Sequence, residues 1–146
     1  MKFVFLTHQF YHDYLGCCEI EKKDKRPYIQ VYTLIGGYLF AIPLRSNINH
    51  TYVLWTDKSQ KCGVDFSKAV IVLKEEYIDQ KNQPHIRQNE FNSLRGKEHI
   101  IQTKMIQYIR EYKKAKQNPH IYHNRVLCQC STLQYFDEII ELMQLK

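Results

Sequence analysis

The chain has 146 residues, of which 44% are hydrophobic, and this suits one domain with one core. Its formal charge of +6 at pH 7 favours polyanionic partners, nucleic acids above all. No apolar run approaches the roughly 20 residues of a membrane-spanning helix, and the run at the amino terminus is too short for a signal peptide. We therefore expect a single cytoplasmic domain over residues 1–146 that has no contact with a membrane.

The cysteines and histidines do not predict a metal centre. Five cysteines are an odd number, which argues against a disulfide framework and for reduced thiols in a reducing compartment. The adjacent pair at 17–18 and the C-x-C at 128–130 do not have the spacing of a structural zinc site. The acidic residues are scattered, and phosphate-binding glycine motifs are absent. We expect neither a metal nor a cofactor.

The chain begins with the pattern of a strand followed by a short helix. Residues 2–6 predict the strand, and Thr7 is a suitable cap for a helix that ends before Gly16. The charged stretch 19–26 is typical of a loop.

Short strands are predicted over the next 50 residues. An aromatic and β-branched run at 28–35 and an apolar run at 38–42 flank the glycine pair 36–37, which predicts a hairpin turn. A further strand is expected at 51–55, and the continuously apolar run 69–73 predicts a buried central strand.

The second half of the chain is mainly helical in pattern. Residues 75–96 are polar and indicate an irregular or partly helical insertion. From Lys97 the apolar period becomes that of a helix, which ends at Asn118 before a proline. Its predicted buried face consists of Ile101, Met105, Tyr108 and Tyr112. Residues 125–130 suggest a last strand, and the Ser131 and Gln134 pair predicts a capping box before a final helix.

This order of elements predicts an α+β fold. We expect a compact, strongly bent antiparallel sheet with packed helices, one of them long and in the C-terminal half. An SH3-like barrel is the simplest version, because closure removes exposed strand edges.

Polar side chains crowd the segment that follows the strand at 38–42. Five of the seven residues after Pro43 can form hydrogen bonds, namely Arg45, Ser46, Asn47, Asn49 and His50. A buried strand that leads directly into a polar loop suits an active site, because the strand holds the backbone while the loop exposes the side chains.

Metal-free cleavage of RNA matches these residue types. The substrate supplies its own nucleophile, the 2′-hydroxyl, and the protein supplies a base, an acid and cations. Histidine titrates near neutrality, which suits His50, while Arg45 can clamp phosphate oxygens and Ser46 can hydrogen-bond them. Lys68 stands just before a predicted strand that would hold it in place, although a lysine there is more often an ordinary edge residue.

A basic surface could bind the rest of the RNA. Eleven tyrosines offer rings on which single-stranded bases can stack, although many must be in the core. The alternative is a merely solvated basic face. The RNA-binding residues that we expect are Asn47, Lys22, Lys23, Arg95, Lys97, Lys104, Arg110, Lys113 and Lys114.

Three motifs occur in a characteristic order: R-P-Y at 26–28, F-A-I-P-L-R-S-N-I-N-H at 40–50 and G-V-D-F-S-K-A-V-I-V at 63–72. In this order and spacing they resemble the toxins of type III toxin–antitoxin systems, and most closely the CptN and TenpN branch, which is related to ToxN and AbiQ. The resemblance covers most of the chain and includes K-M-I-Q-Y-I-R at 104–110 and C-S-T-L at 130–133.

The resemblance implies a Kid/MazF-like β-barrel with helices and a metal-independent endoribonuclease activity. It also implies an RNA inhibitor, transcribed from short tandem repeats, that folds as a pseudoknot and lies in a basic groove. Toxin and RNA would form closed alternating assemblies, in which the toxin cuts the repeat precursor and stays bound to its product. Free toxin would degrade cellular transcripts and stop growth, a response associated with phage defence.

The resemblance also assigns residues. Ser46 matches the serine after P-L-x, Lys68 matches a lysine at the start of the same strand, and Tyr28 matches an aromatic residue near the active site. Arg45 stands where the ToxN form has threonine, and the lysine that follows the serine by two places is missing. The role of that missing lysine is then expected to be taken by His50, by Lys68 or by Arg45, and these alternatives remain open.

The leading hypothesis is therefore an endoribonuclease toxin inhibited by a pseudoknot RNA. Its expected catalytic residues are Ser46, His50, Lys68, Arg45 and Tyr28. The second hypothesis is a non-catalytic RNA-binding barrel that uses the same groove without cleavage. The third is a protein–protein module with a solvated basic face, and the polar loop disfavours it.

Overall fold

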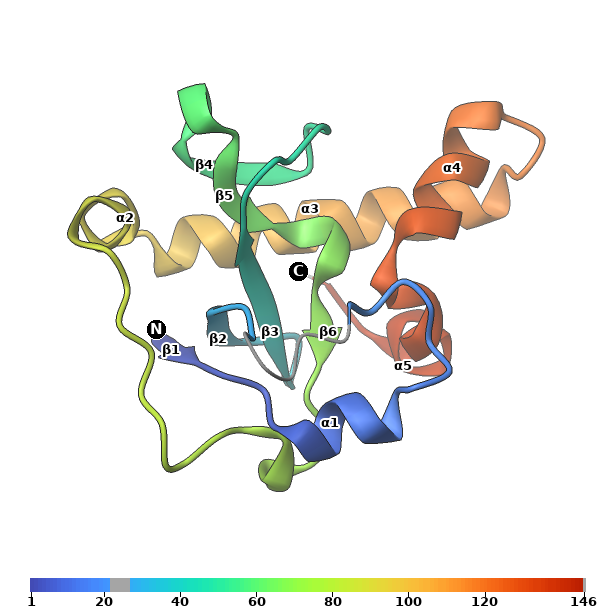
Figure 1. The fold of residues 1–146 in the computed structure, drawn as a ribbon. Coiled ribbons are helices and arrows are strands. Elements are labelled where there is room, and N and C mark those ends of the chain that lie inside the picture. Colours follow the sequence, from blue (N-terminus) through green and yellow to red (C-terminus); the bar gives the residue numbers. More distant parts are fainter. Residues whose placement is uncertain (22–26, 146) are drawn as a thin grey trace.

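The computed structural model describes residues 1–21 and 27–145 and has an α+β fold, as predicted (Figure 1). Its strands are β1 (Lys2–Val4), β2 (Gln30–Ile35), β3 (Tyr38–Arg45), β4 (Val53–Asp57), β5 (Cys62–Asp65) and β6 (Val70–Ile71). Its helices are α1 (His8–Asp13), α2 (Gln88–Leu94), α3 (Glu98–Gln117), α4 (Tyr122–Cys130) and α5 (Asp137–Leu142). Four 3₁₀ turns connect them, namely η1 (Lys58–Gln60), η2 (Phe66–Lys68), η3 (Glu75–Tyr77) and η4 (Thr132–Phe136).

Strand β3 is the centre of an antiparallel sheet with the order β1-β2-β3-β5-β4. Along one edge β3 pairs with β2 over its first six residues. Along the other edge it pairs with β6 at Phe40 and Ala41, and then with β5 at Leu44 and Arg45. The described strands form an open path from β1 to β4, so the sheet is not closed into the expected SH3-like barrel.

The glycine pair forms the predicted turn between β2 and β3. Gly36 and Gly37 have φ of 59° and 85°, and Ile35 pairs with Tyr38 across the turn. Positive φ at both central positions is the geometry of a type I′ turn, which glycine adopts at little cost. The hairpin therefore sets the register that delivers Arg45 to the end of β3.

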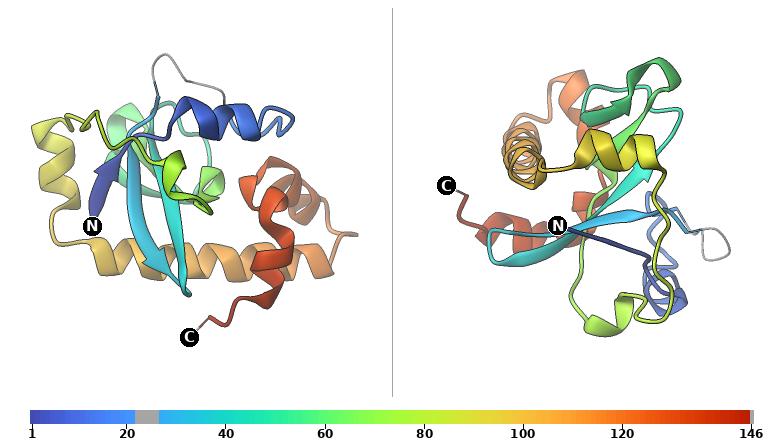
Figure 2. Two further views of the ribbon diagram at one scale, coloured as in Figure 1. Left: turned by 90° about the horizontal axis from the view of Figure 1, so that it is seen from below. Right: turned by 90° about the vertical axis from the view of Figure 1, so that its left-hand side faces the viewer.

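Helices cover the sheet from opposite sides (Figure 2). Helix α3 crosses one side, and α1 lies on the other. The predicted apolar face of α3 is confirmed, since Ile101, Met105, Tyr108 and Tyr112 are all buried. Residues 40–44 of β3 are buried without alternation, because the strand is covered on both faces. The site at the end of β3 thus rests on a rigid support.

Several predicted elements differ from those observed. Residues 125–130 belong to α4 and not to a strand, because this segment satisfies its backbone within a helix that packs on α3. The run 69–73 is buried at 69–72 but contributes only the two-residue strand β6, which pairs with β3 alone and is not central. Residues 62–65, for which no strand was predicted, form β5. The expected strand at 51–55 begins two residues later, at Val53.

The insertion at 75–96 contains η3 and α2, separated by irregular chain. Over residues 1–21 and 27–145, no helix has the length and apolar character that crossing a membrane requires. None of the five cysteines, all of which lie in these ranges, forms a disulfide.

Candidate functional site

A buried carboxylate, Asp65, collects the polar side chains at the end of the central strand. Its side chain is 0% exposed. The Oδ2 atom accepts a hydrogen bond of 2.7 Å from Nη1 of Arg45. The Oδ1 atom accepts bonds of 3.0 Å and 2.6 Å from the backbone N–H and the hydroxyl of Ser67, and His50 Nε2 lies 3.1 Å away. We call Asp65, Arg45, His50 and Ser67 the Asp65 cluster.

The strand register explains how these residues meet. Arg45 pairs with Gly63 of β5, two residues before Asp65, and Asp65 pairs with Val53 of β4. The loop between β3 and β4 is held by Ile48, whose side chain is buried and whose N–H bonds to the carbonyl of Lys61 at 3.1 Å. The pairing of β3, β4 and β5 therefore brings Arg45, which is 20 residues away in sequence, and His50 against the Asp65 carboxylate.

The hydrogen bonds fix the charge of Asp65. Burial by itself raises the pKa of a carboxyl group. Here the hydrogen bonds from His50, Ser67 and Arg45, together with the nearby positive charge, outweigh burial and hold the pKa of Asp65 below its usual value. Asp65 is therefore an anion that neutralises part of the cationic site.

The network also assigns the tautomer of His50. Its Nδ1 accepts a hydrogen bond of 3.1 Å from the backbone N–H of Tyr52. We therefore assign the ring proton to Nε2, which donates to Asp65 and lies 3.2 Å from the hydroxyl of Ser67. The imidazole is oriented by contacts on both of its nitrogens.

Arg45 joins the Asp65 cluster to a second set of polar groups. Its Nη2 donates to Oε1 of Glu21 at 2.7 Å, and the hydroxyl of Tyr28 donates to Oε2 of the same glutamate at 2.7 Å. The guanidinium also lies over the Tyr28 ring, 5.6 Å from its centroid. Burial lowers the pKa of Arg45, but the hydrogen bonds and negative charges around it raise the pKa further than burial lowers it. Arg45 is thus a permanent cation.

Lys68 lies on the same side of the molecule, at the end of η2. Its Nζ donates to Oε2 of Glu19 at 3.2 Å and to the carbonyl of Cys130, the last residue of α4, at 2.8 Å. A cation at a helix C-terminus is favoured by the helix dipole. The lysine that the sequence placed before a strand therefore has a defined position.

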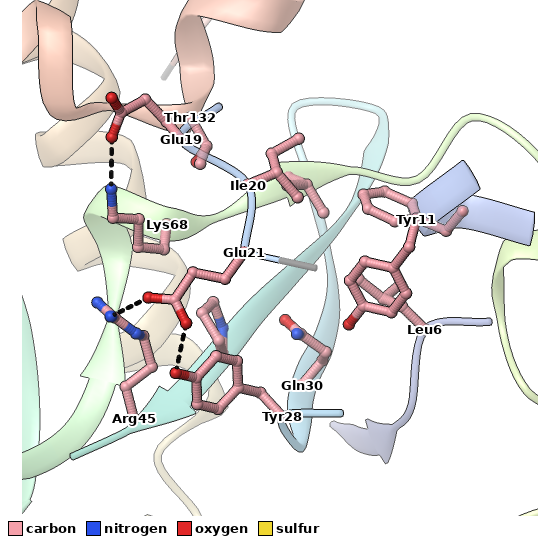
Figure 3. Close-up of a pocket in the computed structure, with 13 residues that line it drawn as sticks. Leu6, Tyr11, Glu19, Ile20, Glu21, Tyr28, Gln30, Arg45, Lys68 and Thr132 are labelled. Atoms are coloured by element: carbon pink, nitrogen blue, oxygen red, sulfur yellow. Dashed lines mark hydrogen bonds and ion pairs between the residues drawn. The ribbon is translucent and has the colours of Figure 1, made fainter. Parts of the chain in front are cut away.

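Arg45 and Lys68, but not Asp65, His50 or Ser67, line a small pocket of about 30 Å³ (Figure 3). Tyr28, Arg45 and Lys68 stand around it with Glu19 and Glu21. Its wall also includes Gln30, which is 4% exposed and whose Oε1 atom has no hydrogen-bond partner among the described residues. Much of the remaining lining is apolar (Leu6, Phe10, Ile20, Pro43 and Val70), while Arg45, Lys68 and the hydroxyl of Tyr28 are groups of the kind that bind phosphate oxygens.

The other expected residues are not part of this cluster. Ser46 and Asn47 follow Arg45 directly, but both are exposed and form no hydrogen bond or ion pair within the parts of the chain that the structure describes. Lys22 and Lys23, like Arg26 of the R-P-Y motif, lie outside the described residues.

The expected RNA-binding residues of the C-terminal half lie on or near α3. Arg95, Lys104, Arg110 and Lys114 are exposed, and Lys97 and Lys113 are partly exposed. Lys104 lines a groove of about 150 Å³ with Tyr52 and Tyr108, and Tyr52 in turn contacts His50 through its ring. The middle of α3 thus adjoins the Asp65 cluster through Tyr52.

Four polar residues of the site, namely Asp65, Ser67, Glu19 and Glu21, were not predicted from the sequence. A signal for two of them exists in D-F-S at 65–67, because an aspartate that bonds the backbone two residues later is a recurrent turn motif. The glutamates carry no such signal, since only folding brings residues 19–21 against Arg45 and Lys68.

The low pKa of Asp65 predicts how stability depends on pH. A carboxylate whose pKa is depressed in the folded state stabilises the fold above its unfolded value, about 3.9, and this contribution is lost as pH falls through the folded value. The difference in the free energy of unfolding between the wild type and Asp65→Asn should therefore shrink from pH 6 to pH 3, measured by urea unfolding. An equal difference at both pH values would contradict the ionised role of Asp65.

Comparisons of the chain with protein-family models, with curated proteins and with solved structures gave no match. Over residues 1–21 and 27–145, no group of three or more histidine, cysteine or acidic side chains is placed to hold a metal ion. The chemistry of the pocket and the motifs around it are therefore the basis for a functional assignment.

Proposed function

We propose that this chain is a metal-independent endoribonuclease, the toxin of a type III toxin–antitoxin system. It cleaves RNA through attack of the 2′-hydroxyl on the adjacent phosphorus, which leaves a 2′,3′-cyclic phosphate and a 5′-hydroxyl. One observation carries the proposal: Arg45 and Lys68 reach one pocket from separate elements, and His50 shares the Asp65 counterion of Arg45. The motifs that resemble these toxins contain the same residues.

In this proposal each residue has a chemical role. Arg45 and Lys68 stabilise the negative charge that develops on the phosphate oxygens, with help from the hydroxyl of Tyr28. His50 exchanges a proton with the 2′-hydroxyl or with the leaving 5′-oxygen. Ser46, exposed beside Arg45, donates a hydrogen bond to the same phosphate. Asp65 orients Arg45 and His50 without touching RNA.

The RNA inhibitor of the toxin and a Kid/MazF-like topology are part of this proposal. The inhibitor is a pseudoknot RNA from tandem repeats, held in closed toxin–RNA assemblies in the cytoplasm and released during phage defence. The basic residues on α3 and the exposed Asn47 contact that RNA. A Kid/MazF-like topology is supported by β3, because this one strand passes from the pairing with β2 and β6 to the pairing with β5, as strands of small, bent barrels do.

Lys68→Ala tests the reaction directly. Because loss of one charge-stabilising donor typically costs about 100- to 1,000-fold in rate, we expect a decrease of that size in RNA cleavage. Expression of the wild-type chain alone should arrest growth and yield transcripts with cyclic-phosphate ends, also in the presence of a chelator. Expression of Lys68→Ala should do neither. Ser46→Ala and His50→Ala are expected to behave like it.

A matched control for this variant is Lys81→Ala, since Lys81 is exposed and lies outside the pocket. It should cleave like the wild type. Normal growth with wild-type protein, or equal loss of cleavage in both lysine variants, would contradict the proposal. Thermal unfolding of each variant separates loss of chemistry from loss of fold.

One observation favours the second candidate function, a non-catalytic RNA-binding protein. Both ring nitrogens of His50 are engaged, one by the N–H of Tyr52 and one by Asp65, so the ring reaches RNA only if one contact breaks. Recovery of intact RNA from a tight complex with the wild-type chain would support this alternative.

A further inference from the structure

Two carboxylates from one short stretch of chain form ion pairs with Arg45 and Lys68, the cations of the pocket. Glu19 bonds to Lys68, and Glu21 bonds to Arg45, at 3.2 Å and 2.7 Å. Between them Ile20 is buried, and its side chain points away from both cations (Figure 3). Glu19, Ile20 and Glu21 all line the pocket, and the two carboxylates that flank Ile20 in sequence each reach one of its cations.

Glu21 holds its partners in the way a phosphate group would. Its two oxygens accept from two different donors, Nη2 of Arg45 and the hydroxyl of Tyr28, both at 2.7 Å. The two non-bridging oxygens of a phosphodiester can accept from the same pair of donors. A carboxylate at this place thus stands where a phosphate of RNA would bind.

The glutamates differ from Asp65 in how firmly they are held. Asp65 is fully buried, whereas the side chains of Glu19 and Glu21 are 37% and 40% exposed. Ion pairs that are this exposed contribute little to stability, because water screens them. Arg45 can therefore keep Asp65 through Nη1 while its Nη2 exchanges one anion for another.

The charges of the pocket residues favour this exchange of glutamate for phosphate. Among the residues that the structure describes, two cations (Arg45 and Lys68) bond to three carboxylates (Asp65, Glu19 and Glu21). These five groups together carry one negative charge, which opposes the approach of a phosphate, although the chain as a whole carries a charge of +6. When the two glutamates turn away, the remaining groups carry a net positive charge and attract phosphate.

We propose that Glu19 and Glu21 occupy the positions of two neighbouring phosphate groups of a bound RNA strand, and that RNA binds by displacing them. The pair makes the free protein a weaker binder of RNA than its cations alone would be. This inference rests on the proposed function, whose RNA-binding site it identifies.

The test measures binding without cleavage. The probe is a fluorescent single-stranded RNA in which every 2′-hydroxyl is methylated, and its dissociation constant is obtained by fluorescence anisotropy at 150 mM salt. Because two exposed ion pairs must break in the wild type, we expect the double variant Glu19→Gln and Glu21→Gln to bind about tenfold more tightly. Adding Lys68→Gln and Arg45→Gln should abolish this gain.

The control removes the same two charges elsewhere. Glu75 and Glu138 are exposed and contact neither cation, so their double glutamine variant should change affinity by less than about threefold at this salt concentration. Equal gains in both double variants, or no gain in the first, would overturn the displacement while RNA binding by the wild type left the proposed function intact. Absence of RNA binding by all variants would overturn both.

Discussion

Asp65→Ala is expected to lower the free energy of unfolding by about 3 kcal/mol, because it removes one partner of a buried ion pair. Arg45 and Ser67 would lose their shared acceptor, and the N–H of Ser67 would lose the side-chain bond that begins η2. RNA cleavage should fall by at least about 100-fold, since Arg45 and His50 would no longer be held in place. Urea unfolding and a cleavage assay measure the two effects.

Asp57→Ala is the matched control for this variant. Asp57 also begins a 3₁₀ turn and accepts bonds from Ser59 and Gln60, but it is partly exposed and pairs with no cation in the described residues. Its loss should cost only about 1 kcal/mol, the usual value of a cap. If both aspartate variants lost the same stability, the Asp65 cluster would be no more than a turn. Asp65→Asn should retain more stability than Asp65→Ala while still losing cleavage.

Gly63→Ala should be comparably destabilising for a purely steric reason. A Cβ atom at this position would clash with the backbone carbonyl oxygen of Leu54 and would lie 2.8 Å from Cγ2 of Val53, both in the neighbouring strand β4. A backbone atom cannot move aside without separating β4 from β5. Overpacking of this kind costs about 3 kcal/mol, and circular dichroism during thermal unfolding would detect it as a lowered melting temperature.

Gly16→Ala provides the comparison, because a Cβ atom there would meet nothing within 4 Å. We expect it to change the free energy of unfolding by less than about 0.5 kcal/mol. A Gly63→Ala protein as stable as Gly16→Ala would mean that β4 and β5 lie farther apart than in this structure. Because Gly63 pairs with Arg45, loss of cleavage should accompany loss of stability.

Local patterns predicted the elements whose signals lie within a few residues. The turn at Gly36 and Gly37 needs positive φ at two positions, and few sequences other than glycine pairs meet that requirement. Helix α3 could be predicted because its buried apolar residues recur with the helical period along 20 residues. The same approach was wrong at 125–130, where a short segment with one buried residue, Leu127, carries too little periodicity to separate helix from strand.

The residues of the site also fall into two groups, those predicted from the sequence and those that only the structure reveals. The sequence predicted roles for Arg45, His50 and Lys68 from their residue types and their places beside apolar strands. The structure gives each of them a defined set of partners, and their catalytic roles stay predictions. The sequence did not predict a role for Asp65, because an isolated aspartate has no distinguishing pattern until the register of β3, β4 and β5 buries it. The sequence grouped Ser46 with Arg45 and His50, whereas in the structure the Ser46 side chain is exposed and lies outside the Asp65 cluster.

By itself, then, the amino-acid sequence determined the fold class, the β2–β3 hairpin, the buried face of α3 and a basic chain with a polar segment after β3. Only the tertiary structure decided that the sheet is open and that Asp65 is the shared anion of Arg45 and His50. It also decided that Glu19 and Glu21 form ion pairs with Lys68 and Arg45 of the pocket. The reason is physical. Turns and helix faces depend on neighbours within one or two turns of chain, whereas the charge state and partners of the site depend on groups that meet only when separate strands and helices pack together.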